Sequence, residues 1–167
     1  MTAQAGLALL PGCALHRVAA RDREELLARM AAAVIGHGHG KPSLTAALLD
    51  RERRFPTGLP TPVVSAIPHT DAVHVLHSGI AVATLAEPVL FGQMGGGEAE
   101  LAARIVVLLC VTDPARQVEA LQLVLARLGE HAAVAGLVDH GDPDTFEAAV
   151  RAWLAGTVVA TSGAAQA

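Results

Sequence analysis

The spacing of apolar residues predicts two helices in the first third of the chain. Within residues 22–36, apolar side chains recur every three or four positions and share one face, formed by Leu26, Leu27, Met30 and Val34. Asp22 and Glu25 have the spacing of an N-terminal capping pair. A second helix is predicted at 44–54, with Ser43 as its N-cap.

The middle of the chain has the pattern of β-strands. Four short runs are rich in β-branched residues and bounded by Pro or Gly, which is typical of strands: 63–67, 79–85, 88–91 and 104–111. The last run is almost wholly apolar, so we expect a central strand that is covered on both faces. A weaker strand pattern lies at 6–10. The Pro- and Gly-rich stretches 55–62 and 92–100 are predicted connections.

The helical period returns after Asp113-Pro114. The first helix there is predicted to bury a stripe formed by Val118, Leu121, Leu125 and Leu128. A shorter helix is predicted at 131–141. The last helix, 142–156, begins with Asp142 as N-cap and Pro143 at the first helical position, and its stripe is Phe146, Val150, Trp153 and Leu154.

This order of elements predicts an α/β fold, a layered αβα domain with a mixed β-sheet covered by helices. The chain has 167 residues and no linker long enough to separate two domains. We therefore expect a single domain over 1–156. The polar and small residues of 157–167 are predicted to form a disordered tail.

Composition and charge exclude several classes of protein. Although 52% of the residues are hydrophobic, no apolar run approaches the roughly 18–20 residues that span a membrane. No secretory signal pattern leads the chain, so we expect a cytoplasmic protein without membrane insertion. The net charge is −4, with no basic block, which argues against a nucleic-acid partner.

Three histidines fall close together in "SAIPHTDAVHVLHSG" (65–79), namely His69, His74 and His77. They admit three interpretations: metal ligands, ordinary surface residues, or one reactive nucleophile with two bystanders. Three imidazoles can hold zinc and leave a fourth position open. However, no H-E-x-x-H pattern is present and Asp71 is the sole nearby carboxylate to orient them. We expect no metal site, and no phosphate-binding loop that would indicate a nucleotide cofactor.

The third interpretation makes one histidine the reactive group. Imidazole is largely neutral near pH 7, so one ring nitrogen is a nucleophile without further activation. It suits reversible capture of a phosphoryl group, whose oxygens need cationic and hydrogen-bonding support. The segment "DRERRFPTGL" (50–59) supplies candidates shortly before the histidines, including Arg51 and Thr57.

Together these segments resemble the enzyme IIA domains of the bacterial phosphoenolpyruvate-dependent sugar phosphotransferase system (PTS), in the fructose–mannitol type. The family pattern of R-E, T-G and A-I-P-H is present as 51–52, 57–58 and 66–69. The stretches "FPTGL", "IPHTDAVHV", "PVLFGQMG" and "QVEALQ" resemble the galactitol-type members. The resemblance extends from about residue 7 to 155.

The resemblance implies a role for each residue of the site. His69 would carry the phosphoryl group and Arg51 would pair with its charge, while Thr57 and Thr70 are further candidates to support the phosphate. His74 would either assist by hydrogen bonding or lie on the surface, and His77 would be solvated or structural. Many relatives carry a second active-site histidine early in the helix after the last strand. "PARQVEALQ" (114–122) has none there, so either His74 or Arg51 alone would have to compensate.

The function implied by the resemblance is that of a cytoplasmic phosphocarrier without a cofactor. It would accept a phosphoryl group from HPr, the histidine-containing carrier of the system, and pass it to a cysteine of enzyme IIB. A membrane enzyme IIC would act downstream. The alternative is a regulatory module that signals through phosphorylation of His69. A zinc hydrolase is a third hypothesis. It would require a stoichiometric bound metal, and we expect none.

Overall fold

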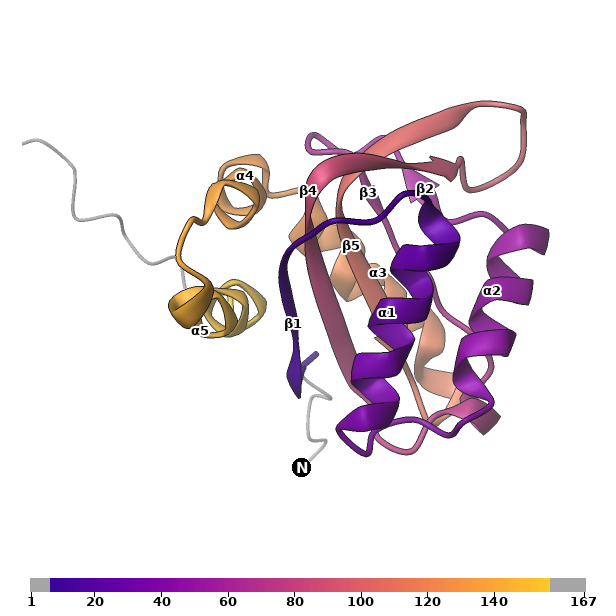
Figure 1. The fold of residues 1–167 in the computed structure, drawn as a ribbon. Helices are drawn as coiled ribbons and strands as arrows, with labels where there is room; N and C mark the ends of the chain where they lie inside the picture. The colour runs from indigo at the N-terminus through magenta and orange to yellow at the C-terminus, as the bar shows by residue number, and fades with distance from the viewer. Residues whose placement is uncertain (1–6, 157–167) are drawn as a thin grey trace, which may run out of the picture.

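A mixed sheet of five strands forms the centre of the structure, a computed structural model that describes residues 7–156 (Figure 1). The strands are β1 (Leu9–Val18), β2 (Gly58–Leu59), β3 (Ser65–Ala66), β4 (Gly79–Gly92) and β5 (Glu100–Cys110). Their order across the sheet is β1-β4-β5-β3-β2. Strand β5 runs antiparallel to β4 and parallel to β3, and β1 runs parallel to β4.

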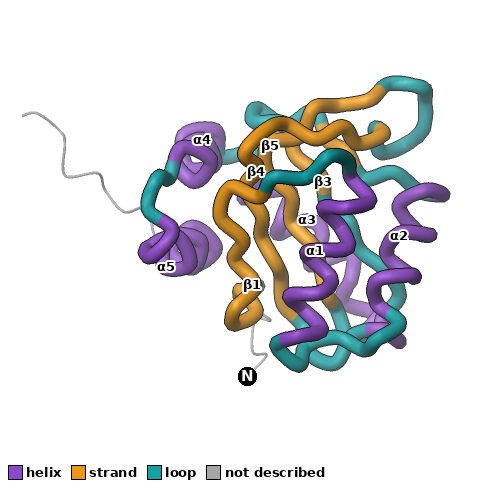
Figure 2. Tube along the Cα trace, in the orientation of Figure 1, coloured by secondary structure: helices purple, strands orange, loops and turns teal. Residues whose placement is uncertain are grey.

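Helices cover both faces of the sheet, which confirms the predicted αβα class (Figures 1 and 2). On one face lie α1 (Arg23–Gly36) and α2 (Leu44–Arg54). On the other lie α3 (Gln117–Leu128), α4 (His131–Asp139) and α5 (Pro143–Leu154). Two single 3₁₀ turns, η1 (Ala72–His74) and η2 (Pro114–Arg116), stand in the connections.

Strand β5 is the central strand that its apolar sequence predicts. Residues 105, 107 and 109 belong to the core beneath α3, α4 and α5, whereas 106, 108 and 110 belong to the core beneath α1 and α2. Because successive side chains of a strand point to opposite faces, a strand covered on both sides must be apolar throughout. Cys110 is one of these buried residues.

The strand predictions needed four corrections. The runs 79–85 and 88–91 form one strand, β4, with a register shift against β5 between Thr84 and Val89. Strand β1 continues to Val18, well beyond the predicted 6–10. Its register against β4 shifts twice, and Gly12 has a positive φ of 78°, so no regular alternation marks it in the sequence. Strand β2 lies within the predicted loop 55–62, and β3 is only two residues long.

The helix bounds agree well with prediction, but two details were wrong. The hydroxyl of Ser43 makes no capping bond to α2 and instead contacts His74. On α3, Val118 is 67% exposed and Leu125 is 40% exposed, whereas Val124 and Leu128 are buried. Two overlapping stripes exist on this helix, and the one that packs against the core consists of Ala120, Leu121, Val124 and Leu128.

The remaining helix signals are confirmed by side-chain contacts. The carboxylate of Asp22 accepts from the backbone N–H of Glu25 (2.8 Å), as a capping residue should. Asp142 caps α5 in the same way, and the predicted stripe of that helix is buried. Residues 157–167 lie outside the described residues, so the division into one domain and a tail stays a prediction.

No single helix within residues 7–156 has the length and hydrophobicity to cross a membrane. One pair of consecutive helical segments reaches the required length and hydrophobicity together, namely Pro114–Leu128 and His131–Asp139. The two segments are bent by 79° relative to each other.

A substitution at Gly58 should destabilise the fold, because β2 approaches the end of β4 closely. A Cβ at Gly58 would lie 2.6 Å from the carbonyl oxygen of Gly92, a backbone atom that cannot move alone. We expect Gly58→Ala to lower the free energy of unfolding by about 1–3 kcal/mol in urea denaturation. The control is Gly136→Ala on α4, where a Cβ meets no atom within 4 Å and helix propensity should add up to about 1 kcal/mol. Equal stability of Gly58→Ala and wild type would contradict this packing.

Candidate functional site

His69 lies at the end of the sheet, just beyond β3. It forms an isolated parallel bridge with Leu109 of β5, and the N–H of Leu109 donates to the carbonyl of Pro68 (3.0 Å). The short strand β3 is thereby prolonged far enough to hold His69 against the central strand. The side chain is nearly buried, with 8% of the residue exposed.

The imidazole of His69 has a defined tautomer. Its Nδ1 lies 2.9 Å from the carbonyl oxygen of Ile67. A carbonyl oxygen only accepts, so Nδ1 must carry the hydrogen. In the neutral ring the lone pair is then on Nε2, which is the nitrogen available to act as a nucleophile.

The surroundings of His69 favour its neutral form. Burial is the largest influence and lowers the pKa of His69 below the ordinary value, and the charge of Arg51 lowers it further. The hydrogen bond to Ile67 and the charge of Asp71 oppose this shift without cancelling it. The imidazole is consequently a free base near neutral pH.

Arg51 is the one arginine of the last turn of α2 whose head group is not held by a close ion pair. Arg53 binds Glu24 (3.1 Å) and Arg54 binds Asp50. The nearest carboxylate to Arg51 is that of the exposed Asp71, with Nη1 and Oδ1 4.0 Å apart.

The head group of Arg51 lies over the ring of Phe55, 4.7 Å from its centroid. Its Nε is buried and has no hydrogen-bond partner in the part of the chain that the structure describes. A buried donor without a partner is costly.

Thr57 is buried and bonded to Glu52, the acidic residue of the R-E pattern, for which the sequence indicated no role. Its backbone N–H donates to Oε1 of Glu52 (2.9 Å), and its hydroxyl contacts Oε1 and Oε2 (3.1 and 2.8 Å). Thr70, which follows His69, is also buried. The support of a phosphate by Thr57 and Thr70 stays a prediction, and the hydroxyl of Thr57 is already bonded.

The other two histidines of the cluster point to different partners. His74 ends the turn η1, and its Nδ1 lies 2.8 Å from the hydroxyl of Ser43. His77 is exposed, and its Nδ1 lies 3.3 Å from Nδ1 of His39. Within residues 7–156, no three His, Cys, Asp or Glu residues come together as a metal ion would require. The three histidines that are close in sequence therefore have different partners in the structure.

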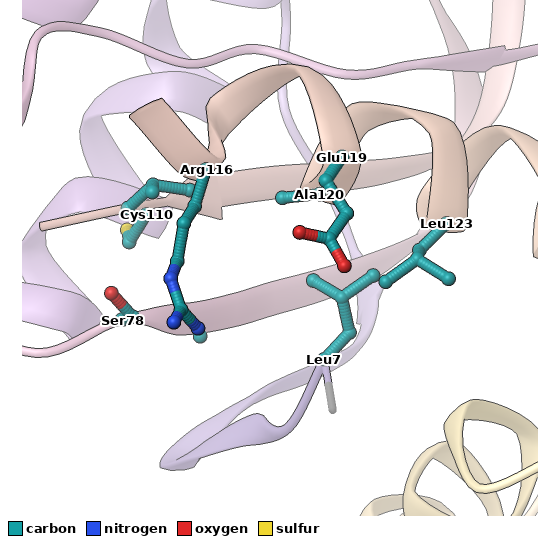
Figure 3. A pocket seen from close by; sticks show the side chains of 9 residues that line it. Leu7, Ser78, Cys110, Arg116, Glu119, Ala120 and Leu123 are labelled. Atoms are coloured by element: carbon teal, nitrogen blue, oxygen red, sulfur yellow. The ribbon is translucent and has the colours of Figure 1, made fainter. Parts of the chain in front are cut away.

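A shallow pocket of about 70 Å³ opens at the same end of the sheet (Figure 3). Its lining includes Ser78, Cys110, Arg116, Glu119 and Leu123, and the side chains of Arg116 and Glu119 both point into it. Neither His69 nor Arg51 lines this pocket. The histidine site is thus separate from this pocket.

The fold and the site define a layered αβα protein with one buried, neutral histidine beside an arginine. Comparisons with known proteins give the family. The profile of the family described as "Phosphoenolpyruvate-dependent sugar phosphotransferase system, EIIA 2" matches residues 11–152. The chain belongs to this family, and it is a phosphotransferase component of the sugar phosphotransferase system.

Individual relatives agree with this assignment. The PTS galactitol-specific EIIA component of Escherichia coli K12 is 30% identical over 108 residues, 64% of this chain and 71% of that protein. The crystal structure of IIA mannitol from E. coli superposes with a TM-score of 0.71 at 20% identity, over 89% of this chain and 99% of that one. The structure of the complex of enzyme IIA and phosphorylated enzyme IIB of the E. coli mannitol system also superposes with a TM-score of 0.71. The sequence identity is 21%, and the match covers 90% of this chain and 99% of that one. The resemblance seen in the sequence is confirmed, and so is the fold.

The titration of His69 tests its electrostatic environment. We expect its NMR midpoint to fall below the ordinary histidine value of about 6.5, because burial and Arg51 disfavour the imidazolium. Arg51→Met should move the midpoint upward, whereas Arg53→Met, which removes a charge held by Glu24, should not. As the pH falls below the ordinary value, the unfolded chain takes up the proton first. The free energy of unfolding should therefore decrease over that range. A midpoint at or above 6.5 would contradict the assigned environment.

Proposed function

We propose that this chain is the phosphocarrier IIA of a sugar or polyol PTS, which takes a phosphoryl group from phospho-HPr on Nε2 of His69. The observation that carries the proposal is a buried, neutral His69, whose Nδ1–H is held by Ile67, together with the partly exposed guanidinium of Arg51, which lies near enough for its charge to lower the pKa of His69. The first group is a nucleophile, and the second is a cation that can attract the oxygens of an incoming phosphoryl group. Membership of the EIIA family supports this role.

The transfer consists of two displacements at phosphorus. The lone pair of Nε2 attacks the phosphorus of the donor, a new P–N bond forms, and the donor's imidazole leaves with its electron pair. A cysteine thiolate of enzyme IIB then attacks the same phosphorus, a P–S bond forms, and His69 recovers its lone pair. The Nδ1–H bond to Ile67 is kept throughout and stabilises the positive charge of the phosphorylated ring.

Arg51 provides the electrostatic part of the mechanism. The phosphoryl group spreads negative charge over its equatorial oxygens in the transition state, so fixed donors and cations lower the barrier. The helix that follows β5 offers no histidine for this purpose, since the first one after β5 is His131 at the start of α4. We infer that Arg51 supplies the main support, with Thr70 and His74 as further candidates.

HPr and enzyme IIB are the proposed partners, with membrane enzyme IIC downstream. The E. coli mannitol IIA was solved bound to phosphorylated IIB, and this chain has the same fold. Large apolar side chains close to the site in sequence are exposed, among them Phe55, Val73 and Leu76. An apolar rim of this kind suits weak, successive docking of two proteins in the cytoplasm. The reaction needs neither a metal nor a nucleotide cofactor.

Phosphorylation of His69 tests the proposal directly. With labelled phosphoenolpyruvate, enzyme I and HPr, the wild type should gain an acid-labile label. His69→Ala should remain at background, because His69 is the one histidine of residues 7–156 that is buried with its Nδ1 against a backbone carbonyl. His77→Ala, which alters an exposed histidine of the same cluster, should label like the wild type. Label that persists in His69→Ala would overturn the proposal, and label that no enzyme IIB accepts would favour the regulatory alternative.

Arg51→Met should slow the labelling of His69 by about 10²–10³-fold, the usual effect of removing one transition-state donor. Quench-flow kinetics with phospho-HPr measure this rate. Arg53→Met is the matched control, because Arg53 lies on the same helical turn but is engaged with Glu24. Equal rates for the two variants would show that Arg51 does not support the phosphate.

A further inference from the structure

We infer that Glu52 and Thr57 form a buried clamp that positions Arg51 and His69 for the reaction, an inference that rests on the proposed function. Glu52 is 4% exposed and Thr57 is 2% exposed. One carboxyl group contacts both the backbone N–H and the hydroxyl of Thr57, at 2.9 and 2.8 Å. The Glu52–Thr57 clamp thus fixes the main chain and the side chain of one residue together.

The clamp is connected to His69 through a continuous run of hydrogen bonds. The carbonyl of Thr57 accepts from the N–H of Ile67 (3.2 Å). The carbonyl of Ile67 in turn accepts from Nδ1 of His69 (2.9 Å). These residues adjoin the pairing of β2 with β3, in which Gly58 lies opposite Ala66. A displacement of Thr57 would therefore move the carbonyl that sets the tautomer of His69.

The clamp also acts on Arg51, which precedes Glu52 on α2. Adjacent residues of a helix point about 100° apart, so holding the Glu52 side chain inward directs Arg51 to a different side. The segment that the clamp closes contains Phe55. Its ring lies under the Arg51 head group, and its N–H donates to the Arg51 carbonyl (2.8 Å). Both halves of the phosphoryl site are held by one buried contact.

A carboxyl group at this position needs an explanation beyond packing. Burying it is costly, and burial raises the pKa of Glu52, an effect that its bonds to Thr57 only partly offset. Among the ion pairs of the described residues, none includes Glu52, and the charge of Arg23 is the smallest of the influences on its pKa. What the group provides is two adjacent oxygens that match the two donors of Thr57.

The test compares variants that break the clamp with variants that keep it. Thr57→Val retains the shape but lacks the hydroxyl, and Glu52→Ala lacks both acceptors. Each should slow phosphoryl transfer to His69 by at least about tenfold, since small misplacements of reacting groups cost up to about 10²-fold. Glu52→Gln can still accept from the N–H and donate to the hydroxyl, and Thr57→Ser keeps its hydroxyl. Both should stay within about twofold of the wild type.

A second readout separates positioning from general stability. In ¹⁵N NMR spectra, the ring nitrogens of His69 should show a single Nδ1–H tautomer in wild type, Glu52→Gln and Thr57→Ser. They should show a tautomer mixture in folded Thr57→Val. Thermal unfolding verifies that each variant is folded. If Thr57→Val and Glu52→Ala do not fold, Glu52→Asp takes their place as the test. Its shorter side chain should not reach both donors of Thr57, so it should still lower the rate of phosphoryl transfer about tenfold.

The outcomes distinguish the clamp from the proposed function. Wild-type rates and an unchanged His69 tautomer in the folded clamp-breaking variants would overturn the clamp. If the wild type takes no label from phospho-HPr, the proposed function fails. The clamp is then tested by the NMR comparison of the His69 tautomer alone. A tautomer mixture in Thr57→Val would then support it, and an unchanged tautomer would reject it.

Discussion

The hydrogen bond from Nδ1 of His69 to the carbonyl of Ile67 determines what this site can do. It selects the tautomer, and so it decides which nitrogen is nucleophilic. It offsets part of the cost of burying the imidazole, and it can stabilise the ring when that ring becomes positively charged. A histidine on a mobile loop would exchange between tautomers and offer each nitrogen only part of the time. The rest of the local structure serves to hold one backbone carbonyl in place.

That carbonyl is held because the very short strand β3 is paired on both sides, with β5 and with β2. On one side it pairs with β5, whose residues 105–110 fill both layers of the core. On the other side it pairs with β2, which the Glu52–Thr57 clamp ties to the end of α2. The site therefore takes its rigidity from the centre of the sheet and its charge from a helix terminus. Cations near a helix C-terminus are also favoured by the helix dipole, which suits the three arginines there.

The sequence predicts the helices and the central strand because their patterns are local. A stripe of apolar side chains or a continuous apolar run depends on the element itself. Strand β1 escapes prediction because its two register shifts and Gly12 break the alternation. On α3, two stripes of similar hydrophobicity overlap, and only the packing against the core selects between them. His69 and Arg51 stand out through their neighbours in sequence, whereas the contact of Ser43 with His74 joins two separate segments and gives no local signal.

Burial and access impose opposite demands on His69. Burial favours the neutral imidazole, yet under the proposed function the donor and the acceptor would both have to bring a phosphorus atom to Nε2. A position at the end of the sheet allows both, because His69 is held against β5 and is still 8% exposed. Docking against exposed Phe55, Val73 and Leu76 would remove water from the site at the moment of transfer. In that drier environment the proposed attraction between the Arg51 guanidinium and the phosphoryl oxygens would become stronger. A partner that covers the rim thus increases the effect of a charge that solvent screens in the free protein.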